Sequence, residues 1–238
     1  MSGAAGQLPD PLEVYRQLRQ RIAQVLADAH AGCGVPACPD WDAIDVLRHL
    51  VGVAEDVAAG DVDGFASHEW SAAQVRRHER VDVAELLRRW QEVSRRLPDA
   101  LPAVDQRVPG IASVGIAMAF DALVHEQDLR SALGLRPVPT DASLVLMSKI
   151  SLVALRDRRR AATGHLLIHL EDGAVFDAGG DGPDRHLHTT RLEVWRALSG
   201  RRTRAEVAGM AWSDPPPDDL ATTWMDPVFD WPEVSVGT

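Results

Sequence analysis

Three side chains that can bind a metal lie within the apolar stripe of a largely apolar segment, residues 114–133 of this 238-residue chain. Asp121, His125 and Asp128 are spaced by four and then three residues, which places them on one face of a helix. Burying a carboxylate and an imidazole is costly unless a partner satisfies both groups. A divalent metal ion is such a partner, since carboxylate oxygen and imidazole nitrogen are both common zinc ligands. The spacing therefore predicts a metal site on this segment.

A second segment supplies a candidate for the third ligand. His49, in WDAIDVLRHLVGV, lies at the edge of the apolar arc of a predicted helix. Catalytic zinc sites commonly use three protein ligands, and helical bundles build such sites from inward-facing side chains on neighbouring helices. We therefore predict that His49, Asp121 and His125 hold the metal, with no catalytic residue distinct from this set.

Two roles fit Asp128 in the sequence. It can accept a hydrogen bond from a ligand imidazole, as carboxylates beside metal sites usually do, or it can pair with Arg130 or Arg136. Asp121 and His125 also have an alternative, because they can form a buried ion pair without a metal. A single histidine beside an apolar face is, in general, more often a hydrogen-bonded core residue than a ligand.

Four further histidines lie on predicted strands. His165 and His169 share one face of a strand, and His186 and His188 share one face of another. Alternating histidines on an amphipathic strand usually form its solvent-exposed face, so we do not predict a metal site there. A glycine-rich phosphate loop, a GxSxG elbow and a CxxC pair are absent from the sequence, and the tryptophans, Trp41 among them, are predicted to be packing anchors.

The two cysteines, Cys33 and Cys38, lie within the segment AGCGVPACPD. A four-cysteine zinc site needs a second pair, which the sequence lacks. A disulfide across the turn between them is compatible with the spacing but not required by it.

Composition indicates a small-molecule partner. The net charge of −10 argues against binding to nucleic acid or to an anionic membrane, because both need a basic surface. We expect a cytoplasmic protein, since the sequence shows neither a secretory signal nor eighteen consecutive apolar residues. The oligomeric state is not indicated.

Capping residues, prolines and glycines divide the chain into predicted elements. Asp40 is expected to cap the helix that carries His49, and Asp141 or Thr140 to open the last helix of the first domain. The predicted helices span residues 11–29, 41–59, 83–97, 114–133 and 141–156. A looser stretch from Asp61 and a proline-bearing connection over 101–110 are expected between them.

From His165 the pattern changes to a hairpin around Asp172 and Gly173, a strand over 185–190 and a helix capped by Thr190. The acidic stretch from residue 214 is expected to be an extended tail that partly covers the domain. The fold class is therefore α+β, with a helical bundle over residues 1–160 and a small α+β domain over 161–238.

Two segments resemble the hallmark motifs of the mycothiol-dependent maleylpyruvate isomerase-like family: CPDWDAIDVLRHLVG, and FDALVHEQDLRSALG with its acidic residue four positions before histidine. The resemblance covers roughly residues 10–135 and implies a DinB-like metal-binding four-helix bundle. The C-terminal part resembles, more weakly, the sterol-carrier-like domain that many of these proteins carry.

The resemblance implies that His49, Asp121 and His125 correspond to a zinc triad, although another divalent metal is also compatible. It implies mycothiol as a second cofactor, whose thiolate adds to a small electrophilic substrate in an isomerase or S-transferase reaction. An arginine, with Arg130 as the candidate, would hold a substrate carboxylate. The founding isomerase activity is associated with glutamate at the acidic position, and Asp121 is one methylene shorter.

Two other functions stay open at this point. The metal can instead activate water in a hydrolase or serve a specialised biosynthetic step. The bundle can also be a non-catalytic binding module without mycothiol chemistry, because fold resemblance alone does not decide function.

Overall fold

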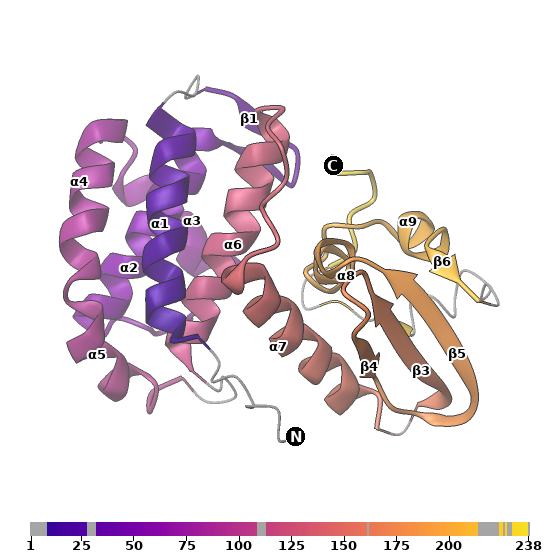
Figure 1. Cartoon of the computed structure of the whole chain (residues 1–238). Coiled ribbons are helices and arrows are strands. Elements are labelled where there is room, and N and C mark those ends of the chain that lie inside the picture. Colours follow the sequence, from indigo (N-terminus) through magenta and orange to yellow (C-terminus); the bar gives the residue numbers. More distant parts are fainter. Residues whose placement is uncertain are drawn as a thin grey trace. The chain divides into compact units, whose positions relative to one another are not determined.

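The computed structural model describes residues 9–27, 32–108, 113–160, 162–213, 224–225, 227 and 230–237 (Figure 1). Contacts divide the chain into two compact units, residues 1–137 and 138–238. Helix α7 (Ala142–Arg158) packs on α8 (Arg191–Leu198), and so belongs to the second unit. The boundary between the two units therefore lies earlier in the chain than the domain boundary near residue 160 that the sequence predicted.

The first unit is helical, with a short β-ribbon that leads into its central helix. Its elements are α1 (Pro11–Ala27), β1 (Gly34–Val35), β2 (Cys38–Asp42), α2 (Ala43–Ala59), α3 (His68–Arg77), α4 (Val83–Ser94), α5 (Leu97–Val104) and α6 (Val114–Ala132). Helix α2 contacts α3, α4, α5 and α6, while α1 packs along α6 (Figure 1). The four expected bundle helices are thus present as α1, α2, α4 and α6.

Two helices lie where the sequence predicted looser chain. The α3 helix begins after Ser67, whose side chain accepts a hydrogen bond from the Trp70 backbone N–H. The α5 helix carries Pro98 in its first turn. Backbone N–H groups in this turn have no acceptor within the helix, so proline, which lacks the N–H, costs no hydrogen bond there. The start of α2 also differs, because Asp42 rather than Asp40 is the N-cap and forms a capping box with Asp45.

Helix α6 is held to α1 by a buried ion pair. Glu126 is fully buried and accepts hydrogen bonds from Arg21 on α1 and from Arg130 one turn further along α6. Losing one partner of such a buried pair is strongly destabilising, because it leaves an uncompensated charge in the core. The pair therefore fixes the position of the helix that carries Asp121 and His125.

The second unit is a four-stranded sheet of order β4-β3-β5-β6 with helices packed on one face. Its further elements are β3 (Thr163–Leu170), β4 (Val175–Asp177), β5 (Asp181–Thr189), α9 (Arg204–Ala208) and β6 (Ala211–Trp212). The expected hairpin is confirmed as β3 and β4, whereas β5 pairs parallel to β3. Leu166 and Ile168 on β3 face the core formed with α7 and α8, so the histidines on alternate positions lie on the opposite face.

The acidic tail falls mainly outside the described residues, which omit 214–223. Trp224 and Met225 belong to the core of the second unit. Within the part of the chain that the structure describes, no helix is both long and apolar enough to cross a membrane.

Candidate metal centre

Helices α2 and α6 bring three potential metal ligands together: His49 from α2, and Asp121 and His125 from α6. The Nε2 atom of His49 lies 3.3 Å from Asp121 Oδ2, and the Nε2 atom of His125 lies 3.5 Å from Asp121 Oδ1. Both imidazoles are buried, and their rings meet edge to face with centroids 5.2 Å apart. Three residues predicted from separate parts of the sequence therefore lie at one point of the bundle.

The separations fit a small divalent cation. A tetrahedral zinc ion with bonds of about 2.0–2.1 Å to nitrogen and oxygen holds its ligand atoms about 3.3 Å apart. The two nitrogen-to-oxygen distances, 3.3 and 3.5 Å, are close to this value. One donor atom from each of the three residues lies within 4.8 Å of the other two.

Gln74 on α3 decides which nitrogen of His49 carries a proton. Its amide nitrogen donates to the buried carboxylate of Asp56 at 2.8 Å, since an ionised carboxylate only accepts. The amide oxygen therefore faces His49 Nδ1, 2.8 Å away, and requires that nitrogen to donate. Arg77 completes the chain with a 2.7 Å ion pair to Asp56. The neutral His49 ring consequently presents the lone pair of Nε2 to Asp121.

A lone pair on His49 Nε2 beside a carboxylate oxygen is unfavourable unless a positive charge lies between them. An added proton supplies that charge in the ion-pair alternative, and a metal cation supplies it in the zinc alternative. A ligand histidine usually donates its other ring N–H to an oxygen acceptor, which is the role that Gln74 fills here. The donor set therefore fits a resident metal ion.

His125 lies between two carboxylates. Its Nδ1 atom is 3.3 Å from Asp128 Oδ2, on the ring edge opposite to Asp121. Burial disfavours a charge on this imidazole, but Asp121, Asp128 and Cys38 together outweigh burial and raise the pKa of His125 to about 10. Asp128 thus has the position expected of an acceptor for a ligand imidazole.

Two residues near the centre were missed in the sequence. Trp41, expected to be a packing anchor, places its ring 5.1 Å from the His49 ring and 6.1 Å from the His125 ring, measured between centroids. Cys38 forms a second group of potential ligands with His125 and Asp128. Both residues lie on β2, directly before the helix that carries His49, and this proximity in sequence was the available signal.

The two cysteines are free thiols in the structure. The Cys33 thiol contacts the Ala132 carbonyl at 3.3 Å, at the end of α6. A disulfide across the turn is therefore not formed.

Arg130, the candidate for holding a substrate carboxylate, is engaged within the bundle. Its Nε donates to Glu126 at 2.9 Å, and a terminal nitrogen donates to the Arg136 carbonyl at 3.2 Å. A role in substrate binding stays a prediction for this residue.

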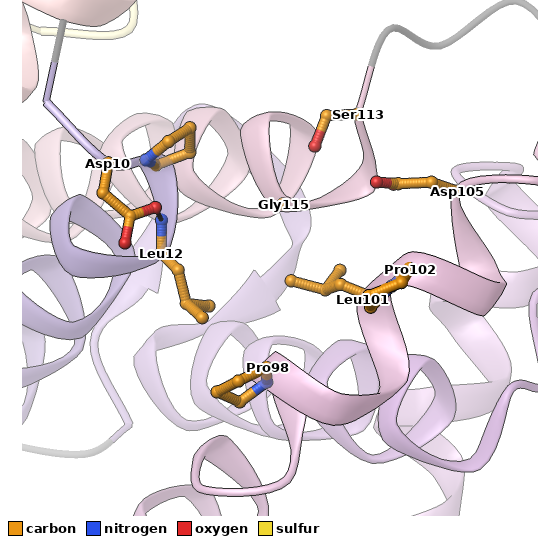
Figure 2. Close-up of a pocket in the computed structure, with 9 residues that line it drawn as sticks. Asp10, Leu12, Pro98, Leu101, Pro102, Asp105, Ser113 and Gly115 are labelled. Carbon is orange, nitrogen blue, oxygen red and sulfur yellow. Dashed lines mark hydrogen bonds between the residues drawn. The ribbon is translucent and has the colours of Figure 1, made fainter. Parts of the chain in front are cut away.

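A separate pocket of about 410 Å³ opens near the start of α6 (Figure 2). Leu12 on α1 and Leu101 on α5 extend into it, beside Gly115. The side chains of the metal centre do not line this pocket, since Asp121 and His125 lie further along α6.

Residues 15–130 match the family model described as the mycothiol maleylpyruvate isomerase N-terminal domain. Over these residues, the helical unit is a domain of the mycothiol maleylpyruvate isomerase N-terminal type. The matched range contains all three candidate ligands, the first segment that carries the family resemblance and all but the last four residues of the second. Among curated proteins, none matches the sequence significantly.

Solved structures extend the fold similarity beyond the matched family domain. A crystal structure of the mycothiol-dependent maleylpyruvate isomerase aligns with a TM-score of 0.57 at 13% identity, over 87% of this chain and 95% of that one. A histidine-to-alanine mutant of that enzyme aligns with a TM-score of 0.56 at 12% identity and the same coverage. At this identity the comparison establishes a shared α+β fold across most of both chains.

Proposed function

We propose that this protein is a zinc-dependent enzyme that uses mycothiol as a thiol cofactor and acts on a small electrophilic substrate, as an isomerase or an S-transferase. The observation that supports this proposal most directly is the convergence of His49, Asp121 and His125, with the His49 tautomer set by Gln74. Family membership adds the thiol cofactor and the reaction class.

His49, Asp121 and His125 would hold the ion. Three protein ligands are typical of catalytic zinc, whereas structural zinc sites commonly use four. When bound there, zinc coordinates the cofactor thiol and lowers its pKa, so that the nucleophilic thiolate forms near neutral pH.

The surrounding side chains orient and shield this set. Gln74 and Asp128 hold the outer nitrogens of the two imidazoles and so keep both Nε2 atoms directed at Asp121. Trp41 packs beside both rings and excludes water from that side. The carboxylates of Asp121 and Asp128 together carry two negative charges, which offset the charge of a divalent ion.

The proposal is tested by incubating the purified, zinc-loaded chain with mycothiol and maleylpyruvate. We expect cis-to-trans isomerisation, or covalent transfer of the thiol to the substrate, that depends on both zinc and mycothiol. An isomerase returns its thiol after each turnover because the carbon–sulfur bond that forms is broken again. An S-transferase consumes one thiol for each product, so the thiol balance separates the two reactions.

His125→Ala is the matched variant for this test, with Cys38→Ser as its control. His125→Ala removes one predicted ligand, and we expect it to fold but to lose stoichiometric metal and the thiol-dependent reaction. Cys38→Ser changes a neighbouring donor outside the predicted triad, and we expect it to keep its metal. Turnover of substrate without thiol would favour the hydrolase alternative, and absence of metal from the wild-type chain would favour a binding module.

A further inference from the structure

Three histidines meet on the sheet face opposite the core of the second unit. His169 on β3 is in register with His188 on β5, and His186 lies two residues earlier on the same face of β5. The Nε2 atom of His169 is 2.9 Å from the Nδ1 atom of His186. The His169 and His188 rings are stacked, with centroids 4.4 Å apart and planes 14° from parallel.

His165, the fourth histidine of this face, is engaged differently. Its Nδ1 atom is 2.8 Å from Asp184, and its Nε2 atom is 2.9 Å from Asp177. These carboxylates favour the protonated ring and raise the pKa of His165, with Asp184 as the larger influence. Both nitrogens of His165 are therefore occupied, and this residue is set apart from the other three.

The three remaining rings have the chemistry of a metal site. Neutral imidazole nitrogen is the commonest protein ligand of transition metals, and three imidazoles lie side by side on this face. The separation of 2.9 Å between the His169 and His186 nitrogens is a few tenths of an ångström less than the roughly 3.3 Å that a tetrahedral ion requires. A small rotation of the two side chains supplies the difference.

His188 provides the third nitrogen only after its ring rotates, because in the structure this ring stacks on His169 and one nitrogen from each of the three rings does not lie within 4.8 Å of the other two. His188 is exposed, and the residue paired with it on β6 is the small Ala211, so its ring has room to rotate about the Cα–Cβ bond. An all-imidazole donor set suits Cu²⁺, Ni²⁺ and Zn²⁺, whereas Mg²⁺ and Ca²⁺ require oxygen ligands.

We propose that His169, His186 and His188 form a second metal site, specific for divalent transition-metal cations and separate from the centre in the helical unit. A cation held there links β3 to β5, whose parallel pairing otherwise depends on backbone hydrogen bonds and on the core below. The sequence alone favoured a solvent-exposed face for these residues, because alternating histidines on an amphipathic strand usually face water and no acidic ligand lies among them.

The test uses the full chain without a polyhistidine tag, in a His125→Ala background that removes the first centre. Titration with Cu²⁺ and with Zn²⁺ is expected to show one bound equivalent of either ion, with tighter binding of Cu²⁺. A His169→Gln/His186→Gln double variant is expected to weaken binding more than about tenfold, because each lost imidazole removes a metal–nitrogen bond. The copper electron paramagnetic resonance spectrum is expected to show coupling to more than one nitrogen.

His165→Gln is the matched control, since it removes a histidine from the same face without touching the three rings. Equal affinity of this variant and its parent supports the assignment. Equal affinity of the double variant and its parent, or an equally large loss in His165→Gln, would overturn it. Metal content of the first centre is measured separately in the wild-type background, so failure of one site is distinguishable from failure of the other.

Discussion

At the scale of single residues, orientation of the two imidazoles decides what the centre can bind. The His49 tautomer follows from one amide, because Asp56 accepts from Gln74 and so directs the amide oxygen at His49. This role of Gln74 could not be predicted from the sequence, because Gln74 lies in a stretch that carried no clear helical pattern. The proximity of Asp121 and His125 could be predicted, because their spacing on one helix is a local property.

Gln74→Ala is expected to lower zinc affinity about 10–100-fold, the usual effect of removing a group that orients a ligand. The reason is that His49 loses the acceptor that holds its Nδ1–H, and the ring is free to turn. Competition with a chromogenic chelator measures the affinity. Gln17→Ala is the control, because Gln17 lies exposed on α1 and its side-chain amide donates to Glu13, away from the metal centre. Equal affinities in the two variants would contradict the proposed role.

Asp128 offers a graded comparison at the same scale. Asp128→Asn keeps an oxygen that can accept from His125 Nδ1, whereas Asp128→Ala removes it. We expect zinc affinity to fall in the order wild type, Asp128→Asn, Asp128→Ala, with the alanine variant about 10–100-fold weaker than wild type. Equal affinities of the asparagine and alanine variants would contradict this role, because both variants lose the charge of Asp128 and only the asparagine keeps an acceptor for His125 Nδ1.

At the scale of elements, capping residues and helix spacing were sufficient to predict α1, α2, α4, α6 and α7. The α3 and α5 helices were missed because α3 buries little of its own surface and α5 is short and contains two prolines. The parallel neighbour of β3 could not be predicted either, since strand pairing depends on partners distant in sequence.

The close approach of α2 and α3 allows a direct test of how these elements build the centre. A Cβ added at Gly52 would lie 2.5 Å from the Cβ of Gln74, so Gly52→Ala forces the two helices apart. We expect a net loss of stability, because overpacking costs about 1–3 kcal/mol and the gain in helix propensity is at most about 1 kcal/mol. Zinc affinity is expected to fall as well, since Gln74 moves with α3.

Urea unfolding and zinc titration measure both effects of Gly52→Ala. Gly34→Ala is the control, because a Cβ at that position meets no atom within 4 Å. If Gly52→Ala destabilises the protein but leaves zinc affinity unchanged, the packing of α2 against α3 does not position the metal ligands, which contradicts the prediction.

At the scale of the whole molecule, the chain consists of two units, each with its own core and each with its own cluster of histidines. Zinc that binds only the folded helical unit stabilises that unit by mass action. At a free zinc concentration of 100 times the dissociation constant, the gain is about 2.7 kcal/mol. Scanning calorimetry is expected to show a zinc-dependent rise in the transition of the helical unit that disappears in His125→Ala and persists in His186→Gln, apart from any zinc effect on the second unit. If zinc raises the unfolding temperature of the helical unit equally in His125→Ala and in the wild type, the stabilising metal binds at another site.

X-ray absorption at the zinc edge, recorded with and without mycothiol, tests the central claim most directly. His49, Asp121 and His125 supply only nitrogen and oxygen, so the zinc-loaded protein is expected to show these ligands alone, at about 2.0–2.2 Å. Addition of mycothiol is expected to introduce one sulfur at about 2.3 Å. A sulfur ligand already present without mycothiol, and absent in Cys38→Ser, would contradict the account by placing the metal on the protein's own thiol.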